Sequence, residues 1–207
     1  MDTMKTGTTT LGLICKDGIV LASDNRITAG SFIAGKDFEK VIPINNNIVV
    51  TVAGSVSDAQ MFVKLFRAEL KLKGMKADRL ISVKEAANFA ARIGYENARS
   101  YFPSIAHLLV GGFDNTGTKI YEVDIDGAIL EVKDYVSTGS GSTMVYGILE
   151  SSYKESITTK EGEDIAIKSI SAAMQRDSAS GGGVSVVVVT KGSIKKTVQK
   201  KVSGNFV

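Results

Sequence analysis

Cysteine and histidine are almost absent from this chain of 207 residues, which contains one of each, Cys15 and His107. A single thiol cannot form an internal disulfide, and zinc or iron–sulfur sites need several thiols or imidazoles. We therefore expect no cofactor and no metal, although this count leaves open a site built from carboxylates alone. Both residues fall in apolar strand patterns, which favours a structural role for each side chain.

Long apolar runs and an excess of charge of one sign are also missing. No run approaches the length of a membrane span, and residues 1–7 are polar and too short for a signal peptide. The net charge of +3 is mixed along the chain. Its densest basic stretches, 195–196 and 200–201, fit a solvated edge strand guarded by lysines better than a nucleic-acid patch. We expect a cytoplasmic protein that binds neither membrane nor nucleic acid.

The chain has enough apolar material for one ordinary domain, because 43% of its residues are hydrophobic and a chain of this length buries most of its unfolded surface. Two capping boxes, Ser82–Glu85 and Thr158–Glu161, mark helix starts, and Gly74 is the expected end of the first helix. The expected strands cover residues 8–15, 19–24, 47–53, 106–113, 119–124, 128–132, 184–190 and 195–202, and the expected helices cover 58–73, 83–99, 142–153 and 159–175. Strands alternating with helix pairs predict a single α+β domain of packed sheets with helices on their outer faces.

The most informative motif is Gly7-Thr8-Thr9-Thr10, at the start of the first expected strand. A Thr hydroxyl needs a base to take its proton, and a Thr whose own α-amino group is freed by cleavage carries that base with it. Cleavage between Gly7 and Thr8 would create the nucleophile and the base in one residue. Taken alone, a run of Thr at the start of a strand also fits ordinary β propensity.

Several polar residues lie at the ends of expected elements, where a buried polar site could use them. Asp24 ends the second strand, and Arg26 follows it by two residues. Lys40 lies beside an apolar stretch, where a buried ammonium would need a carboxylate partner. Gly54 follows an apolar strand and offers a backbone N–H that no side chain obstructs. Each of these residues alone also fits a turn, a cap or a surface ion pair.

Together, the motifs resemble the β subunit of the archaeal-type 20S proteasome, a family of N-terminal-nucleophile hydrolases. The resemblance runs from Gly7 to the last strands. It rests on Gly7-Thr8-Thr9-Thr10, Ser23-Asp24-Asn25-Arg26, Lys40, Val52-Ala53-Gly54, Ser137-Thr138-Gly139-Ser140-Gly141-Ser142 and Gln175-Arg176-Asp177-Ser178-Ala179-Ser180-Gly181-Gly182. The resemblance implies the family's four-layer αββα sandwich, with residues 1–7 as an autocleaved propeptide and residues 8–207 as a single peptidase domain.

The resemblance also implies a role for each matching residue. Thr8 is the expected nucleophile, Lys40 the active-site lysine and Asp24 the carboxylate that pairs with it. Gly54 matches the backbone donor of the oxyanion hole. The other implied roles belong to supporting polar residues (Ser140, Asp177, Ser180), a structural partner (Arg26) and an apolar primary specificity pocket (Ile27, Ile42, Val52, Val56). An apolar pocket implies a threonine endopeptidase with a chymotrypsin-like preference, acting on unfolded polypeptides.

The partners implied by the resemblance are proteasome α subunits and other β subunits in stacked heptameric rings, with a regulatory ATPase acting through the α rings. Three alternatives stay open at this point: a subunit of the bacterial ATP-dependent peptidase that also begins with Thr-Thr, a non-catalytic β subunit of the same kind of ring, and a nucleotide-binding protein. The intact Thr8, Lys40 and Asp24 disfavour the non-catalytic subunit. A dinucleotide fingerprint needs a third Gly where Met144 stands.

Overall fold

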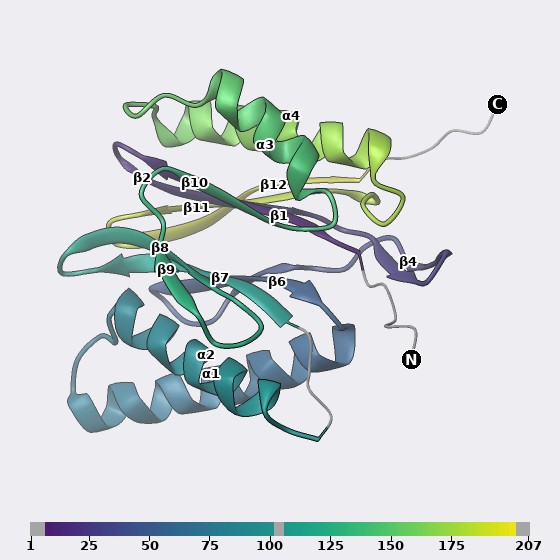
Figure 1. Cartoon of the computed structure of the whole chain (residues 1–207). Coiled ribbons are helices and arrows are strands. Elements are labelled where there is room, and N and C mark those ends of the chain that lie inside the picture. Colours follow the sequence, from purple (N-terminus) through teal and green to yellow (C-terminus); the bar gives the residue numbers. More distant parts are fainter. Residues whose placement is uncertain (1–6, 102–105, 202–207) are drawn as a thin grey trace.

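The computed structural model describes residues 7–101 and 106–201 and has the four layers expected from the sequence (Figure 1). Two five-stranded antiparallel sheets lie against each other, and a pair of helices covers the outer face of each sheet. The first sheet has the order β10 (Tyr135–Gly139), β1 (Thr9–Cys15), β2 (Gly18–Asp24), β11 (Gly183–Thr190), β12 (Ser193–Lys201). The second has the order β5 (Val41–Pro43), β6 (Ile48–Gly54), β7 (Ala106–Asp114), β8 (Gly117–Val123), β9 (Ile129–Glu131).

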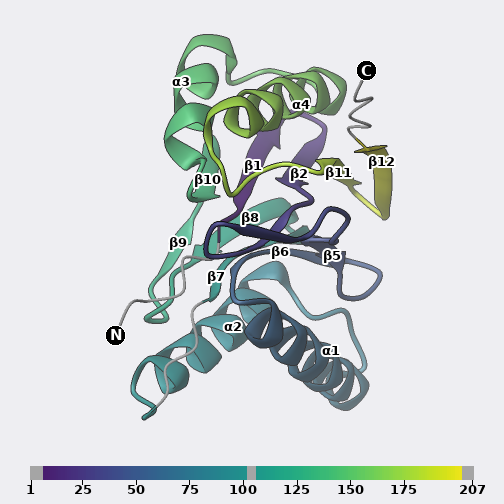
Figure 2. The ribbon, with the colours of Figure 1, turned by 90° about the vertical axis from the view of Figure 1, so that its right-hand side faces the viewer.

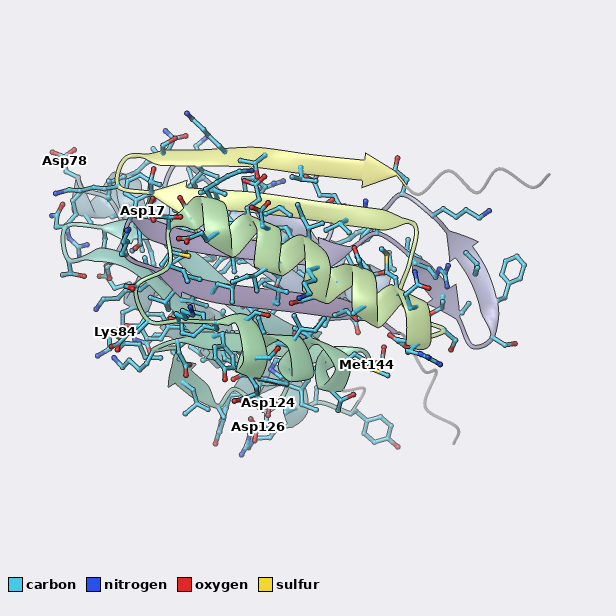
Figure 3. The ribbon with its side chains drawn as sticks, turned by 90° about the horizontal axis from the view of Figure 1, so that it is seen from above. Asp17, Asp78, Lys84, Asp124, Asp126 and Met144 are labelled. Atoms are coloured by element: carbon cyan, nitrogen blue, oxygen red, sulfur yellow. The ribbon has the colours of Figure 1, made fainter. Side chains whose placement is uncertain are left out.

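The helices are divided between the two outer faces. The helices α1 (Val56–Ala77) and α2 (Val83–Ala98) cover the second sheet, and α3 (Ser142–Ser152) and α4 (Thr159–Arg176) cover the first. Figure 3 shows α3 and α4 lying across the strands of the first sheet. A small hairpin of β3 (Ile27–Ala29) and β4 (Phe32–Gly35) projects beyond the end of that sheet (Figures 1 and 3).

Three apolar clusters separate the four layers, and β6 contributes to two of them. Ile48 and Val50 pack with Phe66 under α1 and α2, whereas Val49 packs with Leu109 between the two sheets. Side chains alternate between the faces of a strand, so a strand covered on both sides is apolar at almost every position. The continuous apolar run of β6 therefore follows from its central place in the sandwich.

The helix starts agree with their predicted capping boxes, but the predicted end of α1 is wrong. Ser82 Oγ accepts the backbone N–H of Glu85 at 3.2 Å, and the Glu85 carboxylate accepts the backbone N–H of Ser82 at 2.9 Å. The same reciprocal pair forms at the start of α4. The helix α1 continues through Gly74 to Ala77 and ends where Asp78 takes a left-handed φ of 49°. Glycine weakens a helix without stopping it, and here α1 is held by its buried face.

Four short strands were not expected from the sequence: β3, β4, β5 and β10. Strands of three to five residues are too short to show an alternating pattern. The strand β10 has the larger consequence, because it pairs with β1 from Thr9↔Gly139 onward. The first strand is consequently held on both sides, by β10 and by β2.

The last strand, β12, is an edge of the first sheet, as its lysines predicted. Lys195 and Lys196 are exposed there, and Lys196 Nζ lies 2.8 Å from Glu39 Oε1. The end expected at Val202 lies outside the described residues. None of the described helices combines the length and the hydropathy that a membrane span requires.

Candidate active site

Thr8 lies directly before β1, at an end of the first sheet where polar residues gather, and it is only 4% exposed. Figure 2 looks onto this end of the sandwich. The register places Gly139 beside Thr9 on one side, and on the other β2 ends at Asp24, opposite Val184 of β11. Loops that are distant in sequence therefore meet around one residue.

Asp24 is completely buried and accepts four hydrogen bonds. Its Oδ1 accepts Lys40 Nζ at 2.8 Å and the backbone N–H of Thr9 at 3.0 Å. Its Oδ2 accepts the backbone N–H groups of Arg26 and Gly181, each at 2.9 Å. The carboxylate thus joins the nucleophile's strand to Lys40 and to the loop before β11.

Lys40 is 3% exposed, and its ammonium is paired with Asp24. Burial lowers the pKa of this ammonium below its ordinary value, because a charge is costly away from water. The charge and the hydrogen bond of Asp24 oppose that effect without cancelling it. Lys40 and Thr8 line the same cavity, and a cation in such a place can lower the cost of an alkoxide at a neighbouring hydroxyl.

A second polar set surrounds the backbone nitrogen of Thr8. This nitrogen donates to Ser140 Oγ at 3.3 Å, and Ser140 Oγ donates to Asp177 Oδ2 at 2.6 Å. Ser180 Oγ donates to the same Asp177 oxygen at 2.5 Å. Ser140 lies in the loop between β10 and α3, and Asp177 lies at the end of α4. The three predicted supporting residues are therefore brought together around the atom that cleavage would turn into an amine.

Gly7 fits tightly against its neighbours. Thr8 Oγ1 donates to the carbonyl oxygen of Gly7 at 2.7 Å, and the N–H of Gly7 donates to Thr28 Oγ1 at 3.3 Å. A Cβ at position 7 would overlap the Cβ of Ala179, so a residue without a side chain is required there. Of the expected propeptide, residues 1–6 lie outside the described residues.

The predicted specificity pocket is only partly assembled. Ile27, Val52 and Val56 line one small cavity of about 20 Å³ together with Thr8 and Lys40. This cavity is also lined by Gly54, whose φ of 150° lies in a region that favours glycine.

Ile42, the fourth predicted pocket residue, lies elsewhere. It lines an adjoining surface hollow, which shares Phe38 and Ala59 with the cavity beside Thr8. Another hollow, of about 370 Å³, lies between α1 and α2 and contains none of the predicted site residues.

Arg26 ties the two polar sets together. Its backbone N–H binds Asp24, and its Nη1 donates to the carbonyl oxygen of Ser178 at 2.9 Å. A Cβ at Gly181 would overlap the Arg26 guanidinium, so the arginine packs directly on the loop before β11. Two residues of the site, Thr9 and Thr28, were not expected from the sequence; they hydrogen-bond to Asp24 and Gly7, respectively. The only signal for Thr9 was its place in the Thr run.

Within the described ranges, no three His, Cys, Asp or Glu side chains are grouped so as to hold a metal ion. The αββα sandwich, with a Thr at the start of an inner strand and a buried Lys–Asp pair beside it, defines the class of N-terminal-nucleophile hydrolases. A family model described as "Proteasome subunit" matches residues 4–189. The chain belongs to the proteasome subunit family, as a β-type subunit of the archaeal kind.

Relatives from three archaea illustrate the degree of similarity. The chain is 45% identical to "Proteasome subunit beta" of Ferroglobus placidus over 185 residues, 89% of this chain and 87% of that protein. It is 45% identical to the protein of the same description from Methanosarcina mazei over 190 residues, 92% and 90% of the two chains. It is 42% identical to the one from Methanocaldococcus fervens over 196 residues, 94% and 86% of the two chains.

Proposed function

We propose that this chain is a catalytic β subunit, a threonine endopeptidase whose nucleophile is Thr8 after cleavage of the Gly7–Thr8 bond. One observation carries the proposal: the buried Lys40–Asp24 pair and the set around Asp177 converge on Thr8 from two sides. A purely structural strand end would gain nothing from burying so many polar groups, since each is costly to desolvate.

The first step is self-cleavage. Thr8 Oγ attacks the carbonyl carbon of Gly7, whose oxygen lies 2.7 Å from that hydroxyl. The C–N bond breaks as an ester forms on Oγ, the nitrogen of Thr8 takes up the proton, and water then hydrolyses the ester. Residues 1–7 leave with a free carboxylate, and Thr8 keeps its hydroxyl and gains a free α-amine.

The second step is hydrolysis of a peptide substrate. The free α-amine has a reference pKa of about 7.7–8.0, so it can accept the Oγ proton near neutral pH, through a water molecule. Oγ attacks the substrate carbonyl, the N–H of Gly54 stabilises the oxyanion, and the leaving amine takes a proton. Water releases the acyl group and restores Thr8. Lys40 supports the alkoxide by its charge.

The substrates we propose are unfolded polypeptides, cut after large apolar residues in a chymotrypsin-like manner. The support is the apolar wall formed by Ile27, Val52 and Val56 beside Thr8. Fluorogenic peptides with Leu or Tyr, Arg, or Glu before the scissile bond test this specificity in the assembled particle. Faster cleavage after Arg or Glu would overturn the preference and leave the nucleophile unaffected.

The assembly we propose is the family's stack of heptameric rings, with α-subunit rings outside the β rings, a regulatory ATPase acting through them, and the cytoplasm as its compartment. Exposed apolar side chains on α1 support contacts with other subunits, since Met61 is 58% exposed and Leu65 is 50% exposed. Uncovered apolar surface of this kind is costly in an isolated chain.

The deciding experiment is the intact mass of the subunit after co-expression with an α-subunit partner, followed by a peptidase assay. We expect the wild type and Thr116→Ala, a matched change in an exposed turn, to lose residues 1–7 and to hydrolyse peptides. Thr8→Ala should retain residues 1–7 and show no hydrolysis. A fully assembled wild-type particle that keeps Met1 and is inactive would instead establish the alternative, a structural ring subunit.

A further inference from the structure

The Thr9 hydroxyl is a buried polar group to which the proposed mechanism assigns no role. Thr9 is completely buried, and its Oγ1 lies 2.6 Å from Ser180 Oγ. We propose that Thr9 is a positioning residue, whose hydroxyl orders Ser180, Asp177 and Ser140 around the Thr8 amine. This inference rests on the proposed function and goes beyond it by assigning a role to the residue after the nucleophile.

The directions of the hydrogen bonds follow from counting protons. The Asp177 carboxylate can only accept, and Oδ2 receives the hydroxyls of both Ser140 and Ser180. A hydroxyl has a single proton to donate. The oxygen of Ser180 must therefore accept from Thr9, and the oxygen of Ser140 must accept the N–H of Thr8. The chain of hydrogen bonds is polarised, and Thr9 is the donor at its outer end.

Thr9 also contacts the other polar set. Its backbone N–H donates at 3.0 Å to Asp24 Oδ1, the same oxygen that binds Lys40. The backbone of Thr9 therefore binds Asp24, the partner of Lys40. Its side chain contacts Asp177 through Ser180. Donors in such chains strengthen one another, so the loss of an outer donor weakens the inner bonds.

The Thr9 hydroxyl packs closely against the backbone of Gly141. A Cβ at Gly141 would overlap Thr9 Oγ1, and the same Cβ would lie 3.3 Å from Asp177 Oδ2. The glycine after Ser140 is consequently required for the hydroxyl of Thr9 to reach its partner. Thr9→Val keeps the branched shape of the side chain and removes the donor, but its methyl group cannot lie 2.6 Å from Ser180 Oγ, so the two groups must also move apart.

The test compares wild type, Thr9→Val and Thr9→Ser in the assembled particle, with Thr116→Val as the control. We expect Thr9→Val to lower kcat about tenfold, the effect of one well-aligned hydrogen bond, with KM within about twofold. The acidic limb of the pH profile of kcat should move to higher pH by roughly half a unit. With one hydrogen-bond donor fewer in its chain, the negative charge of Asp177 favours the protonated Thr8 amine more strongly and raises the pKa of that amine. Thr9→Ser, which keeps the donor, should restore both.

The pH readout separates positioning from mere packing. Among the described residues, the charged side chains of the two polar sets are Asp24, Arg26, Lys40 and Asp177, and Thr9→Val alters none of them. A shifted limb therefore reports reorientation around Thr8. An unshifted limb with wild-type kcat overturns the inference. If Thr9→Val does not assemble, Ser180→Ala removes the acceptor of the same bond, and an unshifted limb in that variant overturns the inference equally.

A crystal structure of the Thr9→Val particle provides a second test that needs no activity. We expect the Ser180 hydroxyl to turn from Asp177 or to recruit a water molecule as its new donor. Ser180 in an unchanged position, with no new donor, overturns the inference. An inactive wild-type particle would overturn only the proposed function, because the crystal structure shows the position of Ser180 whether or not the particle is active.

Discussion

Lys40 Nζ lies 2.8 Å from Asp24 Oδ1, but the two partners do not depend on each other equally. Asp24 also accepts three backbone N–H groups, from Thr9, Arg26 and Gly181. Among the described residues, Asp24 is the hydrogen-bond acceptor of the Lys40 ammonium. The carboxylate would therefore remain satisfied without the lysine, whereas the lysine would be an unpaired buried cation without the carboxylate.

This asymmetry predicts different stabilities for two variants that should both lack activity. Asp24→Asn should lower the free energy of unfolding by about 3–5 kcal/mol, the usual cost of breaking a buried ion pair from one side. Asn would also present an amide NH₂ to backbone donors that need an acceptor. Lys40→Met should cost clearly less, although it too should abolish hydrolysis. Urea unfolding of the two variants decides the matter, and equal losses would contradict the asymmetry.

Hydrolysis should decline at alkaline pH before a free lysine would titrate. Burial lowers the pKa of Lys40, so its proton leaves at a lower pH than the ordinary value of about 10.4. The cation, and with it the support for the alkoxide, is present below that lowered pKa and is lost as the pH rises through it. The pH profile of kcat above pH 8 measures the midpoint, with circular dichroism showing that the particle stays folded. A rate that stays flat through pH 10.4 would refute the role given to the Lys40 charge.

Processing should depend on the absence of a side chain at residue 7. Gly7→Ala places a Cβ against Ala179, which must displace the Gly7–Thr8 bond from the hydroxyl that attacks it. We expect release of residues 1–7 to slow by at least about tenfold, since small displacements of reacting groups are costly. Intact mass against time follows the reaction. Gly74→Ala is the control, because the nearest atom to its new Cβ would be 3.8 Å away and Gly74 itself is far from Thr8. Equal rates of processing in the two variants would contradict the requirement for glycine at residue 7.

Cys15 should be inert in the folded protein. Burial raises the pKa of its thiol to about 12, and the charges of Asp17 and Glu161 act in the same direction. At pH 8 the thiolate is then on the order of a thousandfold scarcer than for a free thiol. A thiol reagent should label the native particle very slowly and the urea-unfolded chain rapidly. Similar labelling rates in both states would show that the thiol is exposed.

The sequence predicted the local parts of the fold well, for physical reasons that differ between elements. The starts of α2 and α4 were predictable because a capping box uses residues three positions apart. The end of α1 was not, because packing of its buried face outweighed the cost of Gly74. The strand β10 was missed, since its pairing with β1 depends on residues more than 120 positions away.

The candidate site was predictable only through the resemblance of its motifs to those of the family. Thr8, Asp24 and Lys40 lie where that resemblance implies, although their roles stay predictions until activity is measured. The bond between Thr9 and Ser180 joins residues 171 positions apart, and no local pattern indicates it. For Ile42 the resemblance was misleading: it implied a place in the specificity pocket, but Ile42 lines the neighbouring hollow instead.

The sheet ladder begins at Thr9, one residue after the bond that the proposed self-cleavage breaks. Removal of residues 1–7 therefore breaks no backbone pairing between β1 and its neighbours β10 and β2. Maturation would change the chemistry of one atom and leave the fold as it is: the peptide nitrogen of Thr8 becomes an amine whose partners, Ser140 and Asp177, are already in place. The processed subunit would need no refolding, so its first turnover could directly follow the release of residues 1–7.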